Sequence, residues 1–215
     1  MNQTQRPTGL LAKVKARLPR RVEPVRVDLG CGGAKRDGYI GLDQAASPGV
    51  DHILDLTSDT YPFADASVDA VYSSHFLEHI PEPNHVFQEI GRICKEGARI
   101  EFWTPYAWND DAFLYGHLHL FTEVEWMHFC CSHRDMFVSL LGGMWLFESV
   151  IYVIEPSTIA DLEANRMDLA FAVRYLKNVV LEFGVEMQFT RDLARPAVTP
   201  KRNAAKIRVA PTSGR

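Results

Sequence analysis

A glycine-rich turn follows the first apolar stretch of the chain, and its residue types could do chemistry. The stretch spans 25–29, and glycine occupies positions 30, 32 and 33 of the turn after it. Glycine lets a backbone turn sharply and approach a ligand closely, and open α/β sheets bind ligands at the carboxyl ends of their strands. Asp28 stands just before the turn. A carboxylate there would repel a pyrophosphate and suits a ligand with a cationic, amine-bearing end.

Two further carboxylates stand where a nucleoside-like ligand would need them. Asp43 ends the apolar stretch 39–43, where its oxygens can accept hydrogen bonds from ribose hydroxyls. Asp55, followed by Leu56, could accept one from the amino group of adenine. A nicotinamide dehydrogenase is the alternative, but its G-x-G-x-x-G pattern needs glycine where this chain has Lys35. We therefore favour S-adenosylmethionine over a nicotinamide cofactor.

A second polar cluster follows the predicted strand 98–104. Its aromatic residues are candidates for substrate binding: Trp103, Tyr106 and Trp108. The candidate catalytic residues, in order of preference, are His119, His117 and His79. Histidine suits the removal of a proton from an acceptor hydroxyl because its pKa of about 6.5 lies near working pH.

Metal ligation by this cluster is an alternative that the spacing does not favour. Zinc could use side chains of the stretch 117–133, which contains His117, His119, His128, Cys130, Cys131 and His133, but no C-x-x-C pair is present. Asp110 and Asp111 with His117 could hold Mg²⁺. We predict no metal site, and we expect Cys130 and Cys131 to be buried as small apolar residues.

Strand patterns alternate with helical patterns along the chain, which predicts a mainly parallel sheet. Strands are expected at 25–29, 39–43, 52–56, 68–73, 98–104, 146–154 and 186–191, and helices at 83–95, 122–131 and 158–183. The gap from Asp28 to Asp43 leaves little room for a full first helix, which predicts a tight loop at 35–39. The apolar window 136–154 contains Gly142-Gly143 and Glu148, so it is interpreted as a helix end, a turn and a buried strand rather than a membrane span.

The predicted helix 158–183 carries a heptad-like apolar stripe interrupted by Arg166. Packing across the sheet and pairing in a homodimer are both compatible with such a stripe. The stretch 9–18 has apolar residues at helical spacing with lysine and arginine between them, which predicts a short basic amphipathic helix.

Charge divides the chain into three parts. The formal net charge of −4 combines +6 over residues 1–26, −16 over 27–190 and +6 over 191–215. An acidic body disfavours nucleic-acid binding, because phosphate contacts need a positive face. We predict a basic segment 1–21, one domain over 22–194 and a basic, disordered tail over 195–215. Four irregularly spaced cysteines and the lack of an apolar leader indicate reduced thiols and a cytoplasmic protein.

The order of these motifs resembles the class I S-adenosylmethionine-dependent methyltransferases, and more narrowly their type 11 subgroup. The matching pieces are DLGCGG (28–33), GLD (41–43), LDL (54–56), PFADASVDAVYSSHFLEHI (62–80) and GARIEFWTPY (97–106). The third glycine of the usual G-x-G-x-G is Ala34 here. The resemblance implies an α/β, Rossmann-like fold, with a mostly parallel seven-stranded sheet and helices on both faces.

The same resemblance implies the cofactor and the residues that bind it. S-adenosylmethionine would be bound by Asp28, Gly30, Cys31, Gly32, Asp43, Asp55 and Leu56, with Ser73, Ser74 and His75 bordering the transferred methyl group. We expect O-methylation of a small molecule or of a sugar or glycan hydroxyl. N- or C-methylation stays open, as does a non-catalytic partner subunit that binds the cofactor or its product and uses 158–183 as an interface.

Overall fold

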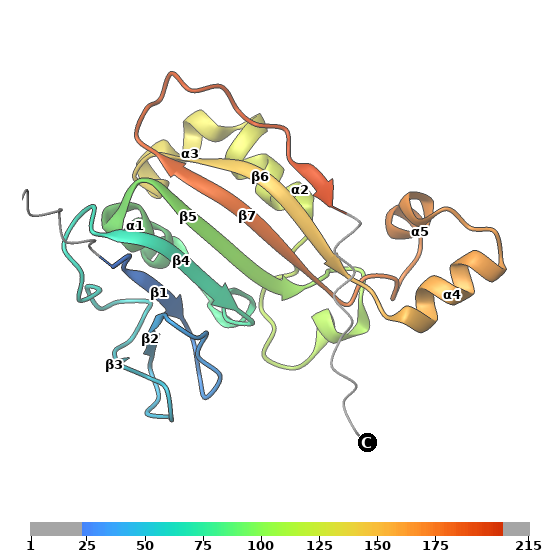
Figure 1. Ribbon diagram of the computed structural model, residues 1–215, viewed down its shortest axis with the longest axis horizontal. Helices are drawn as coiled ribbons and strands as arrows, with labels where there is room; N and C mark the ends of the chain where they lie inside the picture. Colours follow the sequence, from blue (N-terminus) through green and yellow to red (C-terminus); the bar gives the residue numbers. More distant parts are fainter. Residues whose placement is uncertain (1–22, 204–215) are drawn as a thin grey trace, which may run out of the picture.

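Eight strands form one sheet in the computed structural model, which describes residues 23–203 (Figure 1). The strand order is β3-β2-β1-β4-β5-β7-β6-β8, and β7 runs antiparallel to both of its neighbours while the other pairs are parallel. The bounds are β1 (Arg26–Leu29), β2 (Ile40–Asp43), β3 (His52–Ile53), β4 (Val68–Ser74), β5 (Cys94–Pro105), β6 (Met144–Val153), β7 (Glu182–Thr190) and β8 (Lys201–Asn203). The predicted mostly parallel α/β sheet is confirmed.

The sheet has one strand more than predicted. β8 pairs in parallel with β6 inside the stretch 195–215, which was expected to be a disordered tail. Residues 204–215 lie outside the described part of the chain, and so do residues 1–22 with the predicted amphipathic helix 9–18.

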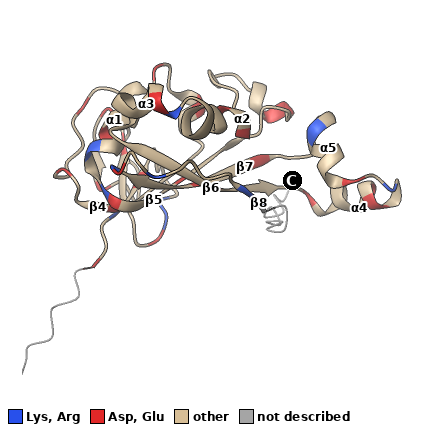
Figure 2. Ribbon diagram, turned by 90° about the horizontal axis from the view of Figure 1, so that it is seen from above, with Lys and Arg blue, Asp and Glu red and all other residues tan. Residues whose placement is uncertain are grey.

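The helices that pack on the sheet lie on one of its faces (Figure 2). They are α1 (Asn84–Ile93), α2 (Glu123–Met127) and α3 (Arg134–Leu141), with the π-helical turn η3 (His128–Ser132) between the last two. Two 3-10 turns, η1 (Leu77–His79) and η2 (Asp110–Phe113), stand in the loops after β4 and β5. The remaining helices, α4 (Pro156–Ala164) and α5 (Leu169–Tyr175), lie beyond the ends of β6 and β7 (Figure 1).

Alternation along the strands explains where the core lies. Ile100 and Phe102 of β5 are buried under the helices, and the Phe102 ring packs against Trp126 and Trp145 at centroid distances of 5.3 and 5.8 Å. Because side chains of a strand point alternately to its two faces, Arg99 and Glu101 emerge on the opposite face. One face of the sheet therefore holds the aromatic core.

The opposite face has no helix over it within residues 23–203, so the prediction of helices on both faces is wrong for this part of the chain (Figure 2). The predicted tight loop after β1 lies there instead. Its Arg36 pairs with Glu101 at 2.8 Å, and its guanidinium stands 4.4 Å from the centroid of the Tyr72 ring. A cavity of about 1000 Å³ opens over this face, lined by residues of β1, β4, β5, β6 and β7.

The predicted continuous helix 158–183 is wrong. The stretch divides into α4 and α5, and β7 already begins at Glu182. The break comes at Arg166, whose backbone is left-handed with φ of 52°, and Asp168 then caps α5 by accepting a hydrogen bond from the Phe171 N–H at 2.9 Å. A left-handed residue cannot continue a helix, so no unbroken stripe exists for a helix-to-helix dimer.

The apolar window 136–154 has the predicted form. α3 ends at Gly142, whose φ of 62° is a left-handed helix end, and β6 follows at once. None of the described helices is both long and apolar enough to cross a membrane.

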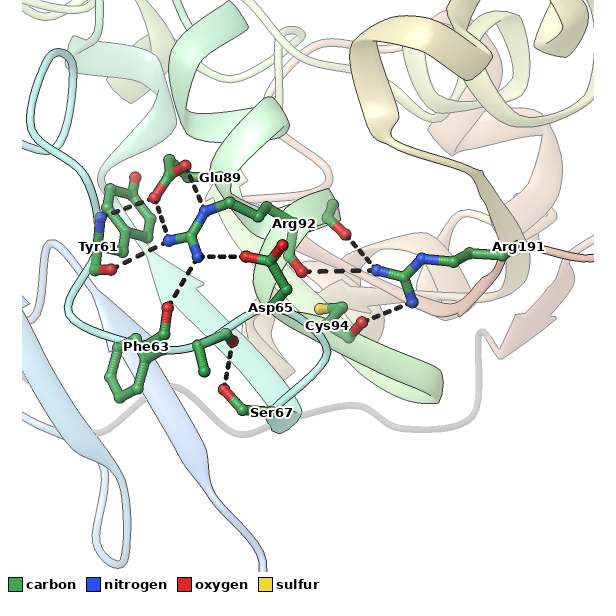
Figure 3. A network of polar contacts seen from close by, with 10 residues as sticks. Tyr61, Phe63, Asp65, Ser67, Glu89, Arg92, Cys94 and Arg191 are labelled. Carbon is green, nitrogen blue, oxygen red and sulfur yellow. Dashed lines mark hydrogen bonds and ion pairs between the residues drawn. The ribbon is translucent and has the colours of Figure 1, made fainter.

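An arginine network fixes the segment 61–67 before β4 (Figure 3). Arg92 of α1 pairs with Glu89 and Asp65 and donates to the carbonyls of Tyr61 and Phe63. Arg191, after β7, donates to backbone carbonyls at the carboxyl end of α1 and at Cys94. These contacts join the segment 61–67, α1 and the end of β7 into one unit beside β4.

Candidate active site

The glycine turn after β1 has the backbone that its composition predicts. Gly30 and Gly32 are left-handed, with φ of 65° and 49°. A Cβ at Gly30 would lie within 2.7 Å of three Phe76 side-chain atoms, whereas one at Gly32 would meet nothing within 4 Å. The amides of Gly30 and Cys31 both donate to the Leu42 carbonyl of β2. The turn is thus packed tightly on one side and open at Gly32.

Asp43 at the end of β2 lies directly beside this turn. Its Oδ2 accepts a hydrogen bond from the Gly32 N–H at 2.9 Å, and its Oδ1 accepts one from the Ala45 N–H at 2.9 Å. Carboxylate oxygens can accept more than one hydrogen bond each, so both keep capacity for hydroxyl donors. The fold brings together the glycine turn and the carboxylate that the sequence assigned to one cofactor.

Asp28 lies beneath the turn with 2% of its surface exposed. Its Oδ2 accepts a hydrogen bond from the Arg36 backbone N–H at 2.8 Å. Burial raises the pKa of Asp28 to about 6, an effect that this hydrogen bond and the charges of Arg36 and Lys35 oppose. Burial likewise raises the pKa of the Cys31 thiol to about 11, so Cys31 is a neutral thiol at pH 7.

The remaining predicted cofactor residues differ in how exposed they are. Asp55 is exposed, and its Oδ1 accepts two hydrogen bonds from Thr57. The hydroxyl of Thr57 donates at 2.6 Å and its backbone N–H at 2.9 Å, and these bonds lower the pKa of Asp55. Leu56 is 3% exposed and belongs to the core. Ser73 is buried, with its hydroxyl donating to the Leu29 carbonyl, whereas Ser74 is half-buried at the end of β4.

Two of the three candidate catalytic histidines meet in the structure. The rings of His79 in η1 and His117 in the loop after η2 stand edge to face at a centroid distance of 4.8 Å. Nδ1 of His79 lies 3.1 Å from the Gly116 carbonyl oxygen. His119 is nearby, but its Nε2 hydrogen-bonds the Ile80 carbonyl at 2.8 Å, which leaves it the least available of the three.

Glu78 joins this pair and was not selected from the sequence. Its side chain is 1% exposed, and neither carboxylate oxygen accepts a hydrogen bond from a described residue. Its backbone carbonyl accepts hydrogen bonds from the N–H groups of Leu118 and His119, which fixes the histidine loop against η1. An acid beside His79, inside the apolar run 76–80, was the only signal in the sequence for this residue.

His75 follows β4 and pairs with acids from two other parts of the chain. Its backbone is left-handed, with φ of 52°, and its Nε2 lies 2.6 Å from Glu182 while its Nδ1 lies 3.2 Å from Oε1 of Glu78. Pairing with the carboxylate of Glu182, and then with that of Glu78, raises the pKa of His75 to about 10. His75 is therefore an imidazolium at neutral pH.

The three aromatic residues predicted to bind substrate do not converge. Trp103 is buried on the face without helices and donates its indole N–H to Glu101 at 2.8 Å. Tyr106 is 4% exposed and donates its hydroxyl to Glu123 at 3.1 Å. Only Trp108, with 58% of its surface exposed, stands free to meet a ligand.

Neither of the two ligand sets considered from the sequence is gathered into a group of three possible metal ligands within residues 23–203. Asp110 pairs with Lys177 and Asn178. Cys130 is buried against Met187, as expected for an apolar residue, whereas Cys131 is only half-buried.

A family model described as a methyltransferase domain matches residues 40–102. No curated protein matches the chain significantly. Among solved structures, an S-adenosylmethionine-dependent methyltransferase from Archaeoglobus fulgidus has a TM-score of 0.50 at 16% identity, with 77% of this chain and 86% of that chain covered.

Two further solved structures are similar at lower scores. One is an S-adenosylmethionine-dependent methyltransferase from Methanosarcina mazei, with a TM-score of 0.47 at 16% identity and coverage of 80% and 95%. The other is geranyl diphosphate C-methyltransferase from Streptomyces coelicolor, crystallised with Mg²⁺, a geranyl thiolodiphosphate and S-adenosylhomocysteine, with a TM-score of 0.44, 15% identity and coverage of 78% and 70%. The resemblance drawn from the motifs is confirmed: this chain has the class I S-adenosylmethionine-dependent methyltransferase fold, and residues 40–102 carry the methyltransferase domain signature.

Proposed function

We propose that this protein binds S-adenosylmethionine at the glycine turn and transfers its methyl group to a hydroxyl of a small molecule or of a sugar or glycan. The observation that carries the proposal is the contact between Gly32 and Asp43 at the carboxyl edge of the sheet, with the buried Asp28 beneath the same turn. Solved structures of the same fold include methyltransferases crystallised with S-adenosylmethionine or S-adenosylhomocysteine.

The chemistry of this edge fits the cofactor. Beyond Gly32 the space is open, so a ligand can approach the backbone of the turn. Asp43 offers acceptor oxygens to ribose hydroxyls, and Asp28 is an anion held by one backbone N–H, which suits an ammonium group. Bound S-adenosylmethionine would supply an electrophilic methyl group on a sulfonium.

The acceptor side follows β4, the strand that pairs with β1. Register places Ser73 opposite Leu29, so η1 begins beside the glycine turn, and Phe76 packs against Gly30. His79 and His117 are the residues that we assign to the acceptor hydroxyl, where they would orient it and help its proton leave. Histidine-assisted removal of a proton supports an oxygen acceptor over a carbon acceptor, whose protons are much less acidic.

Calorimetric titration of the intact protein tests the cofactor. We expect binding of S-adenosylhomocysteine and none of NAD. Asp43→Ala should weaken the affinity for S-adenosylhomocysteine by about tenfold or more, because the hydroxyl acceptors and the support of the Gly32 amide are lost. Asp110→Ala is the matched control: this carboxylate pairs with Lys177 and Asn178 and should leave the affinity unchanged. Equal affinities of wild type and Asp43→Ala for S-adenosylhomocysteine would show that Asp43 does not bind the cofactor.

Mass spectrometry tests the transfer. The protein and S-adenosylmethionine are incubated with extracts of the source organism, and a product heavier by one methylene identifies the acceptor. Fragmentation then locates the methyl group on oxygen, nitrogen or carbon. Binding of S-adenosylhomocysteine without any methylated product would favour the non-catalytic partner subunit instead.

A further inference from the structure

Glu78, His79 and His117 bring three metal-ligating side chains to one point beside the methyl-transfer edge. One ligand atom from each lies within 4.8 Å of the other two, and this is the one such group of three or more acids, histidines and cysteines found among residues 23–203. Two histidines and a carboxylate form a known ligand set for catalytic zinc, which leaves a fourth position for water or substrate. The sequence did not suggest the site, because 38 residues separate His117 from His79.

The carboxylate of Glu78 is the strongest sign of a ligand. It is 1% exposed, and Oε2 has no polar partner among the described residues. Oε1 forms an ion pair with Nδ1 of His75 at 3.2 Å, which leaves Oε2 as the oxygen without a partner within residues 23–203. A buried carboxylate oxygen that accepts no hydrogen bond is costly, and a bound cation is one way in which proteins compensate it.

The two histidines are prepared for ligation in different ways. The Gly116 carbonyl, 3.1 Å from Nδ1 of His79, requires the proton on that nitrogen and so leaves Nε2 with a lone pair. Histidine ligands of metals nearly always donate their other N–H to such a carbonyl or carboxylate. His117 instead has its Nδ1 buried and without a hydrogen-bond partner among the described residues.

Backbone contacts hold the two segments in this arrangement. The Glu78 carbonyl accepts from the Leu118 N–H at 2.6 Å, and His119 is tied to the Ile80 carbonyl at 2.8 Å. Ligands at about 2.1 Å from a tetrahedral zinc ion lie about 3.4 Å apart, so the observed spread of up to 4.8 Å closes by side-chain rotation of the exposed His79 and the half-exposed His117.

We propose that Glu78, His79 and His117 bind a divalent transition-metal cation, with Zn²⁺ as its representative, whose open position takes the acceptor hydroxyl. The second part rests on the proposed function, and in it the two histidines assist loss of the proton through the cation rather than by accepting it. The cation lowers the pKa of a bound hydroxyl, whose proton passes to solvent. The oxygen then forms a bond to the methyl carbon while the carbon–sulfur bond breaks. The bonding electrons go to sulfur, and the products are a methyl ether and neutral S-adenosylhomocysteine.

The cation site is tested without any methyl acceptor. Intact protein, freed of metal by dialysis against a chelator, is titrated calorimetrically with Zn²⁺ and with Mg²⁺, and Co²⁺ is added as a spectroscopic probe. We expect about one Zn²⁺ per chain, a Co²⁺ absorption spectrum typical of a tetrahedral site, and much weaker binding of Mg²⁺, because imidazole ligands favour transition metals.

Variants identify the ligands. Glu78→Gln and His117→Ala should each weaken Zn²⁺ affinity by about 100-fold, since even outer partners of metal ligands contribute 10–100-fold. His52→Ala, an exposed histidine on β3, is the matched control and should bind as wild type. A double variant of His128 and His133, whose ring centroids are 4.5 Å apart, should also bind as wild type. Thermal unfolding confirms that each variant folds, and Glu78→Gln removes the charge with little change of shape.

The outcomes separate the two proposals. Absence of Zn²⁺ binding, or binding that Glu78→Gln leaves unchanged, overturns the cation site even if S-adenosylhomocysteine binds and methylation occurs. Zn²⁺ binding that depends on Glu78 and His117, in a protein that binds no S-adenosylhomocysteine, keeps the cation site and overturns the proposed function. If both ligands bind, chelator should abolish methylation and leave the S-adenosylhomocysteine affinity within about twofold of its value, because the cation meets only the acceptor.

Discussion

The two sides of the candidate site satisfy their charged groups in opposite ways. On the cofactor side, the carboxylates of Asp28, Asp43 and Asp55 each accept a hydrogen bond from a backbone N–H of the loop beside them. On the acceptor side, the carboxylate of Glu78 and Nδ1 of His117 are buried without hydrogen-bond partners among the described residues. The fold itself supplies hydrogen bonds to the carboxylates of the cofactor side, whereas on the acceptor side, within residues 23–203, it pairs Glu78 only with His75 and leaves Nδ1 of His117 without a partner.

His79→Ala should give the largest difference between the effect on methylation and the effect on cofactor binding. Formation of the methylated product, measured by mass spectrometry, should fall by about 10²–10⁴-fold, the range in which removal of a group that handles the proton usually lies. The affinity for S-adenosylhomocysteine should stay within about twofold, because His79 contacts the Gly116 carbonyl and His117 rather than the glycine turn. A parallel loss of affinity for S-adenosylhomocysteine would show that His79 also supports cofactor binding.

Asp28→Asn should raise stability at neutral pH and weaken cofactor binding. The pKa of Asp28 rises from 3.8 to about 6 in the folded state, so between these values the folded protein binds more protons than the unfolded one. The Asp28 contribution to the free energy of unfolding therefore grows as pH falls from 7 to 4. At pH 7 the ionised carboxylate costs at most about 3 kcal/mol.

Chemical denaturation of wild type and Asp28→Asn at pH 7.5 and pH 5 measures this difference. The variant should be more stable by about 1–3 kcal/mol at pH 7.5, and the gap should shrink at pH 5. Comparison of the two proteins is needed because Asp51 and Asp69, whose pKa values are lowered by hydrogen bonds to lysine, lose their contribution at low pH in both. A gap that is independent of pH would show that Asp28 does not titrate.

Tyr106→Phe is expected to have the smallest effect, because Tyr106 lies outside the group of residues that we assign to the acceptor. The sequence predicted a substrate contact, but the buried hydroxyl donates to Glu123, which also accepts from Tyr152 at 2.9 Å. Loss of one such hydrogen bond should lower the free energy of unfolding by about 1 kcal/mol and leave product formation unchanged. A clear fall in methylation by a Tyr106→Phe protein that is still folded would show that Tyr106 contacts the substrate.

The cofactor side could be predicted from the sequence because its residues lie close together along the chain. Asp28, the glycines and Asp43 fall within sixteen consecutive positions, where strand ends and turns can be inferred from local patterns. On the acceptor side the sequence suggested the histidines but not Glu78, because two loops that are distant along the chain come together there through backbone contacts. Periodicity also misled over 158–183, because an apolar repeat does not reveal that Arg166 is left-handed, although Asp168 is a typical first cap of a new helix.

Strand β7 also carries a consequence for how the chain folds. It is the last long strand in the sequence, yet it lies between β5 and β6 near the middle of the sheet. Until residues 182–190 have left the ribosome, β5 and β6 each expose an unpaired edge and cannot join. The central sheet is thus completed only after β7 has been synthesised, by pairing between residues about 30 to 90 positions apart, and such long-range closure is slow and open to aggregation.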